Sequence, residues 1–159
     1  MTMSKPAPVM VQRGLLLDGQ RAPDSERIAE LVAFQRSGHR VLLLARQPQS
    51  WRPTRNSMDT DLGLQQQLHQ AVRRAGAELD GTLYLATGLF ARRQSRTEEL
   101  TRAARRYGVE TGQLIAVGDD ETLLESIVQS GGRALNVGSA QVVGASQHRH
   151  LQAALLALG

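Results

Sequence analysis

Residues 10–19 read Met-Val-Gln-Arg-Gly-Leu-Leu-Leu-Asp-Gly, and the fold class follows from how this stretch ends. It is apolar after Arg13 and stops at Asp18-Gly19, which is typical of a buried strand that runs into a turn. Similar apolar stretches follow along the chain, and they are separated by segments in which apolar residues recur at helical spacing. The predicted strands are residues 10–17, 41–45, 82–86, 114–117 and 134–137.

The helices predicted between these strands have recognisable start and stop signals. Asp24 or Ser25 can cap the first helix, and Gly38 closes it. Strands that alternate with helices indicate a doubly wound, mainly parallel, Rossmann-like sheet with helices on both faces. We therefore predict a single five-stranded α/β domain over residues 10–159, preceded by a flexible segment, residues 1–9. The remaining helices are predicted at 61–75, 97–107, 121–130 and 147–158.

The composition excludes several classes of site. The chain has no cysteine, so disulfides, thiolate zinc sites and thiol catalysis are excluded. No stretch approaches the ~18 apolar residues of a membrane span, and no secretory signal is evident, so a cytoplasmic protein is expected. The formal net charge is +4, and Lys5 is the only lysine. An arginine-rich surface can bind anionic ligands or nucleic acid, or can reflect genomic composition alone.

Two aspartates stand at the carboxyl ends of predicted strands, where such sheets bind their ligands. Asp18 directly follows the first strand, and Asp119 follows the fourth. We expect their side chains to converge in one crevice, where paired carboxylates can hold Mg²⁺ between the protein and a phosphate group. The run from Asp119 to Glu121 can also cap the next helix and form its acidic first turn.

From about residue 11 to residue 139 the sequence resembles the haloacid dehalogenase (HAD) superfamily, and within it the small phosphatases that act on heptose bisphosphate or histidinol phosphate. The first motif of that family is a strand, a nucleophilic Asp, one residue and a general-acid Asp. Here Asp18 matches the nucleophile, and Gln20 stands at the general-acid position. An amide cannot exchange the proton that the reaction requires. The resemblance also implies a core without a large cap domain.

The second and third motifs are incomplete as well. The second is a strand that ends in Thr or Ser and continues with Asn-Gln, whereas Ala45-Arg46-Gln47 stands here and lacks the phosphate-binding hydroxyl. These three are the candidate ligand-binding residues. The third motif supplies a Lys or Arg that neutralises the phosphate, and Arg93 or Arg96 would have to serve.

The fourth motif is Val-Gly-Asp with a second Asp four residues on. Asp119 is kept here, and Leu123 replaces its partner. Leucine cannot hold a metal-bound water, although Asp120 or Glu121 can reach into the same shell. The resemblance thus implies a weakened Mg²⁺ site made of Asp18, Asp119 and Asp120.

These substitutions imply a HAD-type, phosphatase-like protein with little or no phosphatase activity. It would act by binding a phosphorylated ligand or a protein partner, which includes a second copy of itself. Losing a general acid typically costs about 10²- to 10⁴-fold in rate. Heptose bisphosphate phosphatases commonly have a zinc loop with Cys and His ligands. This chain has neither residue type near residues 87–91, where that loop would lie, so no zinc is expected. The first alternative is an active Mg²⁺-dependent phosphomonoester hydrolase in which Asp18 attacks phosphorus.

Other features support different hypotheses. Arg102, Arg105 and Arg106 can form a nucleic-acid or protein interaction face, but few aromatic residues are available to stack on bases, so nucleic acid is disfavoured. His148 and His150 suggest a metal pair, yet positions i and i+2 point apart on a helix, so a structural role is expected.

Residues 46–59 contain several helix breakers, and a long loop above the strand ends is predicted there. Trp51 in this loop would either cover a ligand or anchor the loop on the core.

Overall fold

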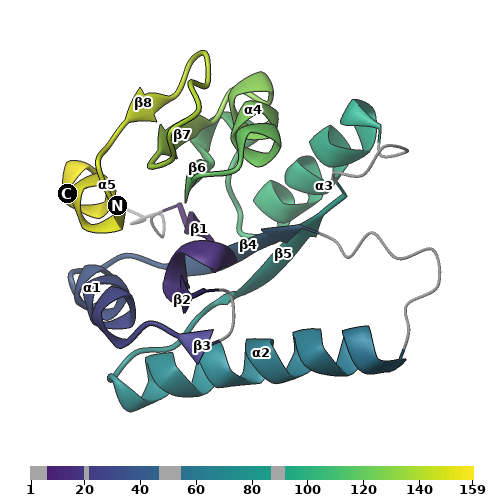
Figure 1. Ribbon diagram of the computed structural model, residues 1–159. Helices are drawn as coiled ribbons and strands as arrows, with labels where there is room; N and C mark the ends of the chain where they lie inside the picture. The colour runs from purple at the N-terminus through teal and green to yellow at the C-terminus, as the bar shows by residue number, and fades with distance from the viewer. Residues whose placement is uncertain (1–6, 20–21, 47–54, 87–91) are drawn as a thin grey trace.

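The computed structural model describes residues 7–19, 22–46, 55–86 and 92–159 (Figure 1). Its main sheet has six strands, and every neighbouring pair is parallel. The order across the sheet is β5 (Gly81–Leu85), β4 (Val41–Arg46), β1 (Val9–Gln12), β6 (Ile115–Gly118), β7 (Arg133–Asn136) and β8 (Ser146–Gln147). The doubly wound α/β prediction is confirmed, with one strand more than expected.

Five α-helices and two 3-10 helices connect the described strands, and the α-helices cover both faces of the sheet (Figure 1). Helices α1 (Ser25–Arg36), α2 (Arg55–Arg74) and α5 (Leu151–Ala157) share one apolar cluster. Helices α3 (Arg93–Arg106) and α4 (Glu121–Gln129) share the other. The short elements are η1 (Arg13–Leu16), η2 (Thr111–Gln113) and a small antiparallel pair, β2 (Leu17–Asp18) with β3 (Ala22–Pro23).

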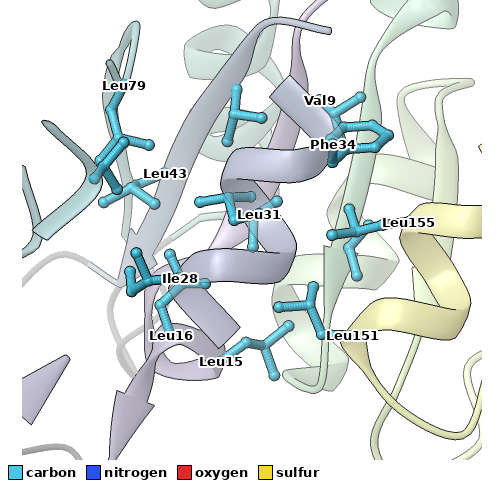
Figure 2. Close-up of a cluster of buried hydrophobic side chains, with 14 of the residues drawn as sticks. Val9, Leu15, Leu16, Ile28, Leu31, Phe34, Leu43, Leu79, Leu151 and Leu155 are labelled. Carbon is cyan, nitrogen blue, oxygen red and sulfur yellow. The ribbon is translucent and has the colours of Figure 1, made fainter. Parts of the chain in front are cut away.

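The strands are apolar on both faces, because successive side chains point to opposite sides of a sheet. In β4, Val41 and Leu43 join the cluster under α1, whereas Leu42 and Leu44 join the cluster under α3 and α4. Figure 2 shows the first cluster, in which Leu31 of α1 lies among side chains from the sheet and from α5. The near-continuous apolar runs in the sequence therefore correspond to strands buried on both faces.

Helix α1 begins as the sequence predicts, and the cap is Asp24. Its carboxylate accepts hydrogen bonds from the backbone N–H groups of Glu26 at 3.0 Å and Arg27 at 3.1 Å. These contacts satisfy two donors that have no partner within the helix. At the other end, Gly38 adopts a φ of 111°, a conformation that favours glycine.

The predicted first strand, residues 10–17, is wrong in its second half. Strand β1 ends at Gln12, which pairs with Leu44, and the chain then turns through η1. Apolar residues stand at positions 15 and 16 because this turn packs beneath α1, where the side chains of Leu15 and Leu16 are buried (Figure 2). Apolar residues that are buried in a turn give the same sequence pattern as a strand.

Other boundaries, among them the starts of α2 and α5, also differ from the prediction. Helix α2 begins at Arg55, so the predicted loop 46–59 is shorter, and its part at 47–54, with Trp51, lies outside the described residues. Asn and Ser residues are tolerated in a first helical turn because its N–H groups need no intrahelical acceptor. Gln147 belongs to β8, and α5 starts only at Leu151. Among the described helices, none is long and apolar enough to cross a membrane.

Candidate functional site

A crevice of about 450 Å³ opens at the carboxyl ends of β1, β4 and β6. The chain leaves β1 to build β4 and β5 on one side and later returns to build β6 to β8 on the other, so β1 stands at the point where the strand order reverses. Ligands of doubly wound sheets bind at this point. The charged and amide side chains of the crevice are Gln12, Arg13, Arg46, Asp119 and Asp120, and Ala45 and several leucines also line it.

Gln12 lines the crevice at the carboxyl end of β1 and makes hydrogen bonds to the segment that follows β6. Its Oε1 accepts from the backbone N–H groups of Asp119 at 2.8 Å and Asp120 at 3.0 Å. Its Nε2 donates to Asp119 Oδ1 at 2.6 Å. The carboxamide therefore links the end of β1 to the start of α4, with each polar atom in a role that only an amide can fill.

The backbone around this carboxamide is packed closely. A Cβ added to Gly118 would lie 2.5 Å from Gln12 Oε1, and a Cβ added to Gly138 would lie 3.0 Å from Asp119. Glycine at these two positions lets the ends of β6 and β7 approach the side chains of the site. The floor of the crevice thus depends on Gly118 as well as on Gln12.

Asp120 and Arg46 form an ion pair across the crevice, from the start of α4 to the end of β4. The Asp120 side chain is 8% exposed, whereas that of Arg46 is 50% exposed. The hydrogen bond from Arg46 Nε to Asp120 raises the pKa of the guanidinium, and the Asp120 charge adds to this against the effect of burial. Asp120 Oδ1 also accepts from Leu123 N–H at 3.2 Å and caps α4. Both Asp120 oxygens are therefore engaged by protein groups.

Asp18, the predicted nucleophile, does not follow the first strand of the main sheet. It lies in β2, pairs with Ala22 of β3 and is exposed. Among the described residues that line the crevice, Gln12 holds the strand-end position at which Asp18 was expected, and Asp18 is not one of them. The predicted convergence of Asp18 with Asp119 is therefore wrong, because the chain makes a turn of 3-10 helix between β1 and Asp18.

Only some of the other predicted site residues line the crevice. Ala45 and Arg46 line it as expected, and Leu123 is buried beside them. Arg96 instead donates to Ser126 Oγ at 2.9 Å and to the Ala86 carbonyl at 3.3 Å, so it ties α3 to α4 and to the end of β5. Gln20, Gln47 and the side chain of Arg93 lie outside the described residues.

Two groups that the sequence suggested for other roles have local partners. Arg102 on α3 pairs with Glu99 at 2.9 Å, and the interaction role of Arg105 and Arg106 stays a prediction. His150 Nδ1 accepts from Ala153 N–H at 3.1 Å and caps α5, while His148 lies 2.8 Å from Ser146 Oγ. The two histidines thus have the structural contacts expected of them.

A polar cluster of Arg13, Asp61, Gln65 and Tyr84 adjoins the crevice through Arg13, and nothing in the sequence indicated this cluster. Arg13 Nη2 pairs with Asp61 Oδ1 at 2.8 Å, and Tyr84 Oη donates to Asp61 Oδ2 at 2.9 Å. Arg13 Nη1 donates to Gln65 at 3.3 Å. Burial raises the pKa of the Tyr84 hydroxyl, and the hydrogen bond to Asp61 adds to this shift. The charge of Arg13 is therefore compensated within the protein.

The described residues of the crevice do not fit the Mg²⁺ ion that the family resemblance implies. Magnesium requires oxygen ligands in near-octahedral geometry and usually binds one or two carboxylates. Asp119 Oδ1 already accepts from Gln12, Gln12 Oε1 already accepts two N–H groups, and Asp120 is paired with Arg46. Among the described residues, no three His, Cys, Asp or Glu side chains are grouped so that they could hold a metal.

Comparison with known proteins places this geometry in a fold family. No protein-family model matches the sequence, and no curated protein matches it. The structure is similar to that of the D,D-heptose 1,7-bisphosphate phosphatase from B. bronchiseptica, determined with magnesium and phosphate, at a TM-score of 0.74 and 17% identity. The similarity covers 96% of this chain and 97% of that one.

Two further solved structures agree with this result. The D,D-heptose 1,7-bisphosphate phosphatase from Burkholderia thailandensis matches at a TM-score of 0.61 and 17% identity, over 96% of this chain and 97% of that one. A HAD-like phosphatase from Mesorhizobium loti, described as putative, matches at a TM-score of 0.71 and 15% identity, over 98% and 86%. The chain therefore has the fold of the HAD-like phosphatases, as a core without a large cap.

Proposed function

We propose that this protein is a phosphatase-like binding protein that has little or no hydrolytic activity. The observation that carries the proposal is Gln12 at the carboxyl end of β1. In the HAD motif, the residue directly after this strand is the nucleophilic Asp, and the residue two further on is the general acid. Gln12 and Gly14 occupy these positions when the end of β1 is matched to the motif.

The chemistry of these two residues supports the proposal. A carboxamide is neither an activated nucleophile nor a proton donor to a leaving alkoxide, and glycine has no side chain at all. Ala45 lacks the hydroxyl of the second motif, and Leu123 lacks the carboxylate of the fourth. A single substitution would leave residual chemistry, but here each of these positions lacks its reactive group.

The ligand proposed for the crevice is anionic and phosphorylated. Arg46 supports this choice, because its half-exposed guanidinium lies at the crevice while Asp120 holds its Nε. A guanidinium whose orientation is fixed in this way is suited to bidentate contacts with a phosphate group. The apolar Leu17, Leu44 and Leu64 line the same crevice and can contact the body of the ligand.

Hydrolysis is tested with a panel of phosphomonoesters and Mg²⁺, with wild type and Asp18→Asn purified identically. We expect no phosphate release above background from either protein. Mg²⁺-dependent release by the wild type would overturn the proposal, and loss of that release in Asp18→Asn would further assign Asp18 as the nucleophile.

Binding is tested by NMR titration with inorganic phosphate, with Arg46→Gln as the variant and Arg105→Gln as an exposed control on α3. We expect Arg46→Gln to weaken phosphate binding by about tenfold or more, because a hydrogen bond to a charged group is worth ~1.5–3 kcal/mol. Equal phosphate affinity in Arg46→Gln and Arg105→Gln would exclude Arg46 as the anion-binding group.

A further inference from the structure

We propose that the Gln12 carboxamide takes the place of a cation in this crevice, so that the site is complete without a bound metal. Gln12 Nε2 donates to Asp119 Oδ1 at 2.6 Å, which is the contact that a cation would make with the carboxylate. Gln12 Oε1 meanwhile accepts from the N–H groups of Asp119 and Asp120. The inference concerns the wild-type site itself and does not depend on which ligand binds there.

The orientation of the carboxamide is determined by its partners. If its oxygen and nitrogen were exchanged, Nε2 would face two N–H donors and Oε1 would face a carboxylate oxygen, so all three contacts would be repulsive. The donor therefore points at Asp119. The carboxamide oxygen occupies the space that a side chain at position 118 would fill, because a Cβ added to Gly118 would lie 2.5 Å from Gln12 Oε1.

Glutamate at position 12 would have nearly the same shape but the opposite polarity at one atom. Its first oxygen could still accept from the two backbone N–H groups. Its second oxygen would replace the amide nitrogen that now donates to Asp119 Oδ1 and would lie against that oxygen with no hydrogen between them. Two ionised carboxylates in such contact repel each other unless a proton or a cation lies between them. At a pH high enough to ionise both groups, Gln12→Glu therefore creates a requirement for a cation that the wild type does not have.

The test measures the unfolding temperature in EDTA, in Mg²⁺ and in Mn²⁺ for the wild type and for Gln12→Glu. The control is Gln66→Glu, which makes the same chemical change at an exposed position of α2. We expect the wild type and Gln66→Glu to be insensitive to the metal. Gln12→Glu should unfold at least ~3 °C lower in EDTA, and a divalent cation should raise its unfolding temperature.

A reciprocal variant keeps the test decisive if Gln12→Glu fails to fold. Asp119→Asn in the Gln12→Glu background replaces the repelling oxygen by an amide donor and reverses the direction of the hydrogen bond. We expect the double variant to regain the wild-type unfolding temperature in EDTA. Stabilisation of the wild type by Mg²⁺, equal unfolding of Gln12→Glu and Gln66→Glu in EDTA, or a double variant no better than Gln12→Glu would each overturn the proposal.

Discussion

The hydrophobic interior of the sheet keeps what a doubly wound fold needs, whereas the described residues at the carboxyl edge of the same strands match few of the reactive positions of the HAD motifs. In the interior, Leu43 of β4 packs under α1 and Leu42 packs on the opposite face. At the edge, Gln12 and Ala45 lie near the carboxyl ends of β1 and β4 and supply neither a nucleophile nor a hydroxyl. The two regions belong to the same strands, but packing constrains the residues of the interior and chemistry constrains those of the edge. Residues at the edge can therefore change while the fold is retained.

The largest loss of stability is expected from a substitution that leaves a cavity in the interior. Leu31 of α1 is fully buried, and Leu31→Ala should lower the free energy of unfolding by about 2–5 kcal/mol. Leu62→Ala on α2 is the control, since that side chain is 58% exposed and its loss should cost no more than about 0.5 kcal/mol. Urea unfolding gives both values, and equal losses would mean that the interior is not assembled as described.

A second prediction concerns the packing of the edge. Gly118→Ala would bring a Cβ to 2.5 Å from Gln12 Oε1 and displace the carboxamide, with an expected cost of about 1–3 kcal/mol for unpaired polar groups. Gly63→Ala has open space in α2 and should stabilise the protein by about 0.5–1 kcal/mol.

Gln12→Ala provides the check on that mechanism in urea unfolding. If the clash is with Gln12, the cost of Gly118→Ala should be smaller in the Gln12→Ala background than in the wild type. Additive costs would show that Gly118 is needed for a reason unrelated to the carboxamide.

A smaller loss of stability is expected from a substitution at the N-terminus of α1, a helix that packs on the interior of the sheet. Asp24→Ala removes the acceptor of two backbone N–H groups and should cost about 1 kcal/mol. Ser25→Ala tests the other cap that the sequence allowed, and we expect a change within about 0.5 kcal/mol because Ser25 is exposed. A larger loss in Ser25→Ala than in Asp24→Ala would contradict the cap seen here.

The smallest effect is a pH dependence at Tyr84, in the polar cluster around Arg13. The pKa of Tyr84 is raised above its usual value of 10.0 in the folded protein, so folding favours the neutral phenol. The stability that this group contributes is present below about pH 10 and is lost as the pH rises through the folded-state pKa. The difference in unfolding free energy between wild type and Tyr84→Phe should therefore fall between pH 8 and pH 11. A difference that stays constant or grows would argue against the Tyr84–Asp61 hydrogen bond.

The sequence predicted the interior better than the edge, for physical reasons that particular residues illustrate. Val41 to Ala45 form an unbroken apolar run that only burial on both faces explains, and Asp24 precedes a periodic helix. The end of β1 could not be predicted, because Leu15 to Leu17 are buried in a turn and a short strand and give the same pattern as a longer first strand. Gln12 consequently appeared to lie inside the first strand, and Asp18 appeared to end it.

Other contacts carried no local signal in the sequence. The strand β8 has only two residues, Ser146 and Gln147, and both are exposed, so no alternation identifies it. Asp61 and Tyr84 lie 23 residues apart and meet only because α2 packs beside β5. Such pairings depend on tertiary structure, which propensity and periodicity do not describe.

Amide hydrogen exchange at Asp119 and Asp120 tests the central claim, that the Gln12 carboxamide fills the end of β1 and is bonded to the start of α4. We expect both N–H groups to be protected in the wild type and to lose this protection in Gln12→Met, while Glu26 and Arg27 at the cap of α1 do not change. Exchange of Asp119 and Asp120 at the same rate in the wild type and in Gln12→Met would contradict it.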